Sequence, residues 1–249
     1  GADVNALTLS GGVLTLNGDV ESDGALDFTS VDAITLGGNV VITGDDGGTK
    51  KDITFDAANI ITGANTLSLA GDTVTLYQVG DGTTDPTQLT VTAATGLSLY
   101  GNLTIDGAVA LDTNVAAITL AAASTINASG GSNAAVSLAD VTGDFNLIVT
   151  GDTGASGSAI TLDGADVNGL TLSGGVLTLN GDVESDNALD FTNVGSITLG
   201  GNVIVTSQNS DSSNAAGNIT FDSANIITGA STLALDGDTV TLYQVGNGA

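Results

Sequence analysis

The sequence predicts an all-β protein, a parallel β-helix (β-solenoid), and three observations support that prediction. Short apolar–polar–apolar triplets recur along the chain, Gly, Asn and Asp fill the gaps between them, and a long internal repeat covers most of the sequence. The composition agrees, since the 249 residues include 36 Gly, two Lys and no Met. A chain so poor in helix formers and so rich in Thr, Val and turn residues is expected to form strands and corners.

The triplets have the alternation of half-buried strands. In Leu14-Thr15-Leu16 and Ile53-Thr54-Phe55 the two outer side chains lie on one side of the strand and the middle one on the other. Neighbouring triplets often begin about seven residues apart, which is too close for the longer strands of a sandwich. A strand of three or four residues and a corner of similar length, repeated, instead wind the chain into a solenoid.

Three such strand-and-corner units form one coil of about 20–23 residues, so the chain would make roughly eleven coils. With ~4.8 Å between paired strands, this rod would be ~50 Å long. Corners such as Asn17-Gly18-Asp19 and Asn180-Gly181-Asp182 hold residues that tolerate the left-handed backbone of a sharp turn. The chirality of parallel crossovers predicts that the helix is right-handed.

A long repeat joins the two ends of the sequence. Residues 1–82, the first copy, recur at 164–248, the second copy, with 36 of 43 identities in one block and 25 of 31 in another. Residues 83–163, the middle segment, complete the first unit. We therefore expect a single continuous β-solenoid over 1–249, taken from an extended tandem array.

The two copies differ in length at one place. GDDGGTKK at 44–51 corresponds to SQNSDSSNAAG at 207–217, which is three residues longer. We call these segments the first and second insertion. Because the sequence on both sides is nearly identical, we expect the insertions to bulge out of the coil without changing it.

The charge and composition exclude several kinds of function. The net charge is −26, and Lys50 and Lys51 are the only basic residues. Nucleic acid is therefore not expected as a partner, because phosphate binding requires Lys and Arg. The chain contains no Cys and no His, which excludes zinc–thiolate sites, Cys nucleophiles and His-based catalysis within it. No run of eighteen apolar residues is present, so we expect no membrane span in this sequence.

Aspartate pairs provide the candidate metal ligands. Asp45 with Asp46, and Asp236 with Asp238, are weak candidates for Ca²⁺, which takes six to eight oxygen ligands. The competing interpretation is that Asp is a corner residue whose side chain accepts hydrogen bonds from its own turn. The second copy has Asp236 where the first copy has Ala70, which weakens that pair as a shared site.

Residues 34–76 carry a resemblance to a known family. The phrases ITLGGNVVITGDDGG and DITFDAANIITGANTLSLAGDTVTL resemble the repeats of giant bacterial surface proteins, the filamentous-haemagglutinin-like adhesins and related autotransporter passengers. The resemblance is one of repeat style and covers the whole chain. It implies a parallel β-helix, secretion, and a location outside the cell or on its surface, in a bacterium or archaeon. It supplies no catalytic residue.

These observations lead us to expect a non-catalytic structural or adhesive segment, a rigid extracellular rod, fibre or sheath. Its expected partners are neighbouring copies of itself, end to end or side by side, and surface glycans. One alternative is a β-helical enzyme acting on polysaccharides, although lyases of that kind need cationic groups and the chain has no Arg. Ice binding is a weaker alternative, because the Thr-Val-Thr motifs at 73–75, 90–92 and 239–241 are irregularly spaced.

The three tyrosines complete the list of surface candidates. Tyr77, Tyr100 and Tyr243 each follow a Leu expected to point inward, so alternation places all three rings outside. Three scattered rings are more typical of ordinary surface than of a sugar-binding platform.

Overall fold

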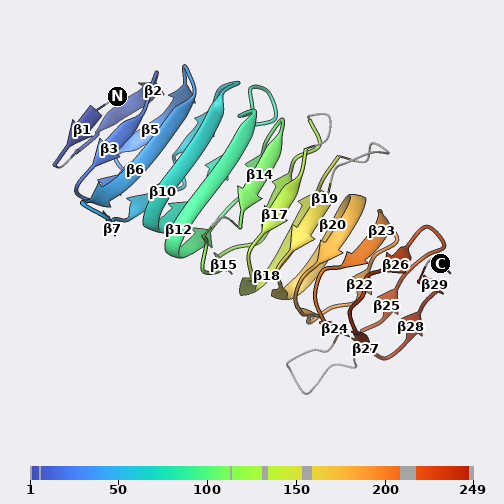
Figure 1. The fold of residues 1–249 in the computed structure, drawn as a ribbon. Helices are drawn as coiled ribbons and strands as arrows, with labels where there is room; N and C mark the ends of the chain where they lie inside the picture. The colour runs from blue at the N-terminus through green and yellow to red at the C-terminus, as the bar shows by residue number, and fades with distance from the viewer. Residues whose placement is uncertain are drawn as a thin grey trace.

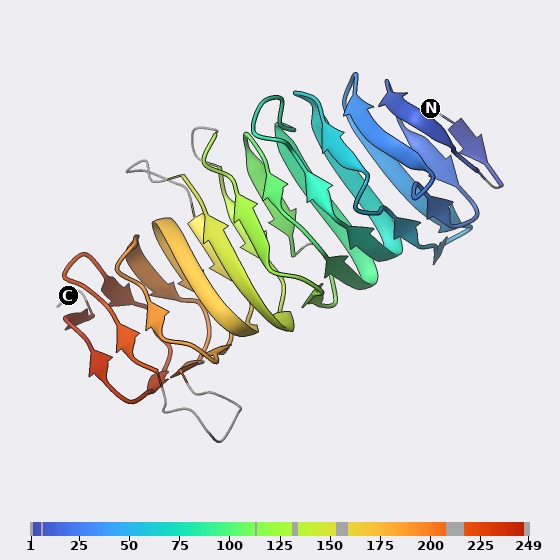
Figure 2. The same cartoon turned by 180° about the vertical axis from the view of Figure 1, so that it is seen from behind.

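In a computed structural model the chain is an elongated stack of strands, and the parallel β-helix prediction is confirmed (Figure 1). The structure describes residues 2–5, 7–112, 114–130, 134–152, 159–207 and 217–246. Throughout these ranges the regular elements are strands, so none of them contains a helix that could cross a membrane. Seen from behind, the strands stack in the same way from the N-terminal to the C-terminal end (Figure 2).

The strands form three parallel ladders, which we call A, B and C, and the hydrogen bonds of each ladder run along the rod from coil to coil. Ladder A contains β1 (Ala2–Val4), β3 (Val20–Ser22), β6 (Val40–Asp46), the first parts of β10 (Thr66–Leu76) and β12 (Gln88–Leu99), β14 (Ala108–Leu111), β17 (Val136–Leu138), β19 (Ala159–Leu162), the last part of β20 (Ala165–Leu179), β23 (Val194–Leu199), β26 (Ile226–Thr228) and β29 (Gln244–Val245).

Ladder B contains β4 (Leu26–Asp27), β8 (Ile53–Thr54), the second parts of β10 and β12, β15 (Ile118–Leu120), the first parts of β18 (Val141–Thr150) and β20, β21 (Val183–Ser185), β24 (Val203–Ser207) and β27 (Leu233–Asp236). Ladder C contains β2 (Gly11–Leu16), β5 (Val31–Leu36), β9 (Ile60–Thr62), β11 (Gln78–Val79), β13 (Leu103–Thr104), β16 (Ser124–Asn127), the second part of β18, the middle of β20, β22 (Leu189–Asp190), β25 (Ile219–Thr220) and β28 (Val240–Thr241). The chain visits the ladders in the order C, A, B.

Regular coils have the expected length. Side chains accept backbone N–H groups one coil later at separations of 21, 22 and 23 residues, from Asp52 to Thr73, Asp19 to Val41 and Asn102 to Thr125. The coil that holds the second insertion is longer, with 30 residues between the bonded Asn202 and Thr232. The hand of the helix stays a prediction.

The inward residues of the triplets form one continuous apolar core. Leu172 and Ile219, both expected inside, are 2% and 0% exposed, whereas the outward Thr171 is exposed. Phenylalanines stack within this core in both copies: the rings of Phe28 and Phe55 lie 4.8 Å apart, and those of Phe191 and Phe221 lie 4.9 Å apart. Burial of such side chains, at roughly 25 cal/mol per Å² of apolar surface, is the main force that holds coil on coil.

One buried asparagine lies at the equivalent corner of each copy. Asn59 and Asn225 occupy equivalent positions and are 0% and 1% exposed. The Asn225 amide donates to the carbonyl of Val194 at 2.6 Å, and its own oxygen accepts the N–H of Asp222 at 2.8 Å. Asn59 makes the matching bonds to Val31 and Asp56. Each amide therefore ties its own turn to the coil before it.

Gly63 and Gly229 show why some corners require glycine. They occupy equivalent positions and have φ angles of +117° and +133°, a region that L side chains rarely adopt. A Cβ at either residue would also clash with a backbone carbonyl oxygen one coil earlier, that of Leu36 or Leu199. The close approach of consecutive coils therefore excludes any side chain here.

The two ends of each insertion are joined by a backbone hydrogen bond, and we call this closed base the neck of the insertion. Strand β7 (Thr49–Lys50) pairs antiparallel with β6, so the first insertion is a small hairpin. At its base the Lys51 N–H donates to the Gly44 carbonyl at 3.0 Å, and at the equivalent place Gly217 donates to Ser207 at 2.9 Å. Residues 208–216 of the second insertion lie outside the described residues. The two necks are thus the same despite the difference in length.

Candidate functional sites

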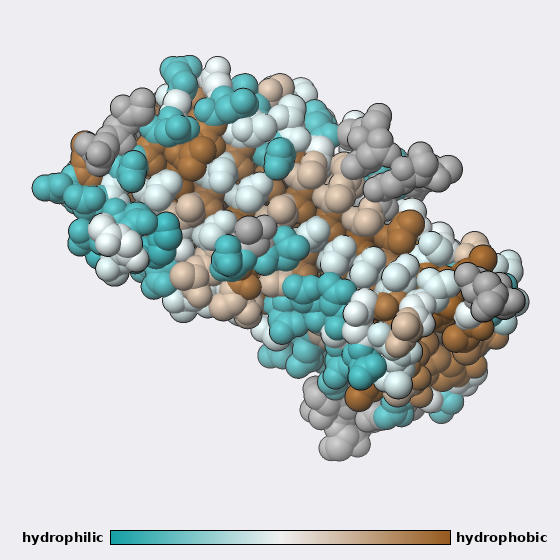
Figure 3. Space-filling model, in the orientation of Figure 1, coloured by the Kyte–Doolittle hydropathy of each residue, from teal (hydrophilic) through white to brown (hydrophobic). Residues whose placement is uncertain are grey.

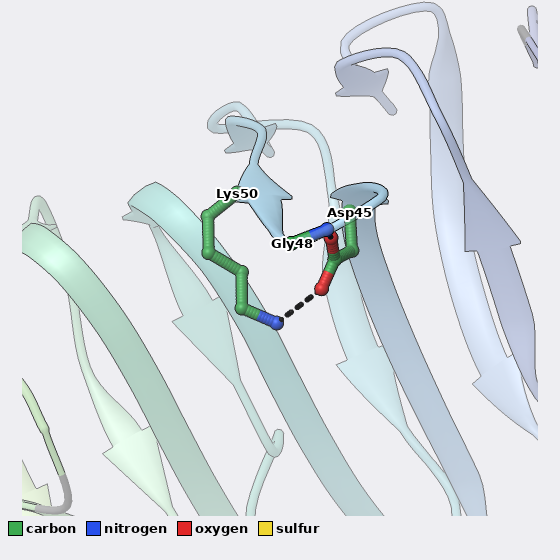
Figure 4. A network of polar contacts seen from close by, with 3 residues as sticks. All are labelled: Asp45, Gly48 and Lys50. Carbon is green, nitrogen blue, oxygen red and sulfur yellow. Dashed lines mark hydrogen bonds and ion pairs between the residues drawn. The ribbon is translucent and has the colours of Figure 1, made fainter.

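The first pair of calcium candidates lies in the hairpin of the first insertion, where lysines neutralise it. The Asp45 carboxylate lies 2.9 Å from the Lys50 Nζ and accepts the Gly48 N–H at 2.6 Å (Figure 4). Lys51 pairs more loosely with Asp46 at 3.7 Å. The hydrogen bond from Lys50, followed by that from Gly48, holds the pKa of Asp45 below its usual range. The two lysines are thus engaged by the two acids.

The second pair lies far from the first. Asp236 ends β27 and Asp238 follows it, near the C-terminal end of the rod, and both residues are exposed (Figure 1). The backbone N–H of Asp238 donates to the Gly217 carbonyl at 3.0 Å. The described part of the chain contains no group of three or more acidic side chains arranged to hold a metal ion. Neither pair is therefore extended by a further acidic ligand there.

Many corner aspartates bond to their own turn, as the competing interpretation predicted. Asp27 accepts the Thr29 N–H at 2.9 Å, and the hydrogen bonds from the Thr29 hydroxyl and N–H lower the pKa of Asp27. Asp81 accepts from both Thr83 and Thr84, at 2.8 and 3.1 Å, and the bonds from Thr84 and then Thr83 lower its pKa. Such Asx turns fix the corner where the chain changes direction.

Other corner side chains bond to the next coil, which the sequence analysis missed. Asp19 accepts the Val41 N–H at 2.8 Å, and the equivalent Asp182 accepts the Ile204 N–H at 2.8 Å. Asn102 does the same for Thr125. These bonds continue the coil-to-coil hydrogen bonding at the corners. Each of these residues directly precedes a strand, and that position in the sequence could have identified them.

An acidic groove lies where the middle segment meets the second copy. It has a volume of about 400 Å³ and is lined by carboxylates, those of Asp140, Asp163, Asp166, Asp182 and Glu184. Asp163 accepts a hydrogen bond from Asn180 at 2.8 Å, and Asp182 accepts the Ile204 N–H. The sequence analysis did not single out this cluster, because its members come from three successive coils.

Two of the three tyrosines form a stacked pair, which corrects the expectation of scattered rings. The ring centroids of Tyr77 and Tyr100 lie 4.6 Å apart with an angle of 12° between the planes. Tyr100 is 40% exposed and Tyr243, the counterpart of Tyr77, is 64% exposed. The rings lie outside as predicted. The pairing of Tyr77 with Tyr100 depends on the register between consecutive coils, which the sequence alone does not give.

Threonines line up on the outer surface of ladder A. Thr161, Thr178, Thr198 and Thr228 occupy consecutive positions in register. The adjacent outward positions hold residues such as Val176 and Ser196, so this surface lacks a second row of threonines beside the first. A regular two-row Thr surface, which ice binding would use, is therefore not formed on these strands.

No protein-family model matches the chain, and no curated protein or solved structure matches it either.

Proposed function

We propose that this chain is a non-catalytic structural or adhesive repeat segment that forms part of a rigid extracellular rod, fibre or sheath. One observation carries the proposal: the ladders continue without interruption from the middle segment into the second copy. Leu147 pairs with Leu170 in ladder C, and Leu162 pairs with Leu179 in ladder A. A second copy that stacks on the core of the first needs no linker, so further copies would lengthen one rod.

The location proposed is outside the cell, on the surface of a bacterium or archaeon. The support for it is the resemblance of the repeats to those of filamentous-haemagglutinin-like adhesins. Neighbouring copies are the proposed partners, end to end or side by side, with surface glycans as further ligands of an adhesive rod.

Calcium enters this proposal as a counterion for a chain with a net charge of −26. The described residues contain no group of three or more acidic side chains arranged to hold the ion, so its candidate places are the exposed pair Asp236 and Asp238 and the acidic surface as a whole. Melting curves in NaCl and CaCl₂ at equal ionic strength separate general screening, which acts over ~8–10 Å, from binding. A higher melting temperature in CaCl₂ would support binding, and equal temperatures would remove calcium from the proposal.

The test of the rod is its length. A chain extended by one further copy of residues 1–163 should be longer by ~35 Å, given about 22 residues per coil and ~4.8 Å between coils, with an unchanged cross-section. Small-angle scattering measures both dimensions. An extended chain that behaves as two bodies joined flexibly would contradict the proposal.

The acidic groove favours one other function, a polysaccharide-acting enzyme. Glycosidases use a pair of carboxylates, and Asp166 and Glu184 line the groove from neighbouring strands. The rod proposal expects no release of reducing sugar from neutral or acidic polysaccharides. Release that is lost in both Asp166→Asn and Glu184→Gln would instead establish the enzyme.

A further inference from the structure

The two insertions leave the rod from different ladders. The first insertion follows β6, which pairs with β3 and β10 in ladder A. The second follows β24, which pairs with β21 and β27 in ladder B. Ile42 and Val205, the equivalent inward residues just before the two insertions, therefore lie on different sides of the helix.

The same displacement applies to every strand that the two copies share. In the first copy, β4 lies in ladder B and β5 in ladder C; their counterparts β22 and β23 lie in ladders C and A. The stacked phenylalanines move with them, from the B side for Phe28 and Phe55 to the C side for Phe191 and Phe221. Each element of the second copy has thus moved one ladder forward in the order C, A, B.

The cause is the number of strand segments in a unit. From β2 to its counterpart at the end of β20, the chain passes through 22 ladder positions, which is seven full coils of three plus one. A unit of 21 positions would have returned each residue to its own ladder. The extra position turns the following copy by one side of the helix.

The insertions themselves do not produce this rotation. Both are closed at the base by the same backbone hydrogen bond, Lys51 to Gly44 and Gly217 to Ser207. On the far side of each neck, the Lys51 and Gly217 carbonyls accept the N–H groups of Asp72 and Asp238 at 2.9 and 3.0 Å. The coil therefore resumes in the same register whether the insertion is short or long.

We infer that a tandem array of this unit presents its insertions at the three corners of the rod in turn, each turned by one third of a revolution from the last. The inference rests on the proposed function, because it extends the observed step to further copies. After three units, or 22 coils, an insertion returns to its starting corner, ~106 Å along the rod at ~4.8 Å per coil.

The first insertion is the part of this pattern whose side chains are described, and the partner it fits is a second copy of the rod. It carries two carboxylates and two lysines, which pair with one another. Contacts between copies through this hairpin would avoid the repulsion that the acidic coils impose.

Spin labels on the chain itself test the rotation, since the absence of cysteine allows labelling at chosen sites. Val41 and Ile204 are equivalent outward residues beside the two insertions, 40% and 48% exposed. Thr198 is the matched control, because it lies seven strand pairings from Val41 within ladder A. Double electron–electron resonance would compare Val41→Cys/Ile204→Cys with Val41→Cys/Thr198→Cys.

The control pair should give ~34 Å, seven coils at ~4.8 Å each. The Val41–Ile204 pair should be longer by roughly 5–10 Å, because it adds a sideways step across one face of about seven residues at ~3.3 Å each. Two narrow and equal distances would overturn the rotation and leave the rod intact. Broad distributions for both pairs would overturn the rod itself, and the inference with it.

Discussion

The segment TVTLYQVG occurs twice, at 73–80 inside the rod and at 239–246 in the last described coil. Inside, Val74, Leu76 and Val79 are completely buried, because β12 and β13 stack on them. At the end, their counterparts Val240, Leu242 and Val245 are 38%, 42% and 59% exposed, and apolar surface gathers at this end of the molecule (Figure 3).

Identical local sequence therefore has two environments, and the neighbouring coil decides between them. This is the behaviour of a linear repeat protein, in which stability is a sum of coil and interface contributions. Strands this short gain little from their own residues, so each coil depends on contact with the coils beside it.

The largest difference should come from the buried leucine. Leu76→Ala removes a side chain that is 0% exposed and should lower the free energy of unfolding by ~2–5 kcal/mol. Leu242→Ala removes the same side chain at the open end and should cost under about 1 kcal/mol. Denaturant unfolding of the two variants measures both values. Equal losses would show that local sequence, rather than stacking, determines stability here.

Unlike the two leucines, the two buried asparagines should give similar losses of stability when they are replaced, because both lie inside the rod. Asn59→Ala and Asn225→Ala each leave a backbone carbonyl unsatisfied, that of Val31 or Val194, at a cost of ~1–3 kcal/mol. Both residues are covered despite lying in different copies, so the two losses should agree within about 1 kcal/mol. Unfolding curves of the two variants test this, and an effect at Asn59 alone would mean that the second copy is loosened well inside its last coil.

The two tyrosines of the TVTLYQVG segments, Tyr77 and Tyr243, should give a smaller difference in stability than the two leucines. Tyr77 stacks on Tyr100, and such a pair contributes about 0.5–1.5 kcal/mol beyond its buried area. No ring stacks on Tyr243 among the described residues, so Tyr243→Ala should have less effect than Tyr77→Ala. Near-ultraviolet circular dichroism provides a second measurement, because only Tyr77→Ala should remove the signal of the stacked rings.

The smallest effect should appear at low pH, at a corner next to TVTLYQVG. The hydrogen bonds from Thr84 and Thr83 lower the pKa of Asp81 in the folded state, so its carboxylate stabilises the fold at pH values above the usual pKa of about 4. This contribution is lost as the pH falls through the lowered pKa. Asp81→Asn should therefore be less stable than the parent at pH 7, and the difference should shrink as the pH falls from 7 to 2. A constant difference at both pH values would mean that the charge has no part in holding the turn.

The sequence predicts what depends on neighbours along the chain. The alternation in Leu-Thr-Leu triplets identifies the inward side chains, and Gly, Asn and Asp identify the corners. The Tyr77–Tyr100 stack, the Asp19-to-Val41 hydrogen bond and the acidic groove depend instead on which residues lie one coil apart. Coil lengths vary with corners and insertions, so that register cannot be read from spacing alone.

The first insertion shows that sequence-based prediction can also fail for residues that lie close together in the chain. Asp45 and Asp46 are adjacent acids in the sequence, and a metal site was a reasonable hypothesis. The hairpin brings Lys50 and Lys51 back against them. The turn at Gly47 and Gly48, with φ angles of +57° and +98°, produces that contact, and the Asp45 carboxylate helps to hold the turn by accepting the Gly48 N–H.

The direction of the ladder hydrogen bonds also determines how the rod would respond to force. A pull on the two chain ends would load the hydrogen bonds of the outermost coil at each end. The coils between them are still held by neighbours on both sides, so the bonds would break one coil at a time. Each coil of about 22 residues would then release a chain of ~70–80 Å at ~3.3–3.6 Å per residue. A tethered rod would thus extend in small, nearly equal steps from its ends, absorbing work while the remaining coils stay folded.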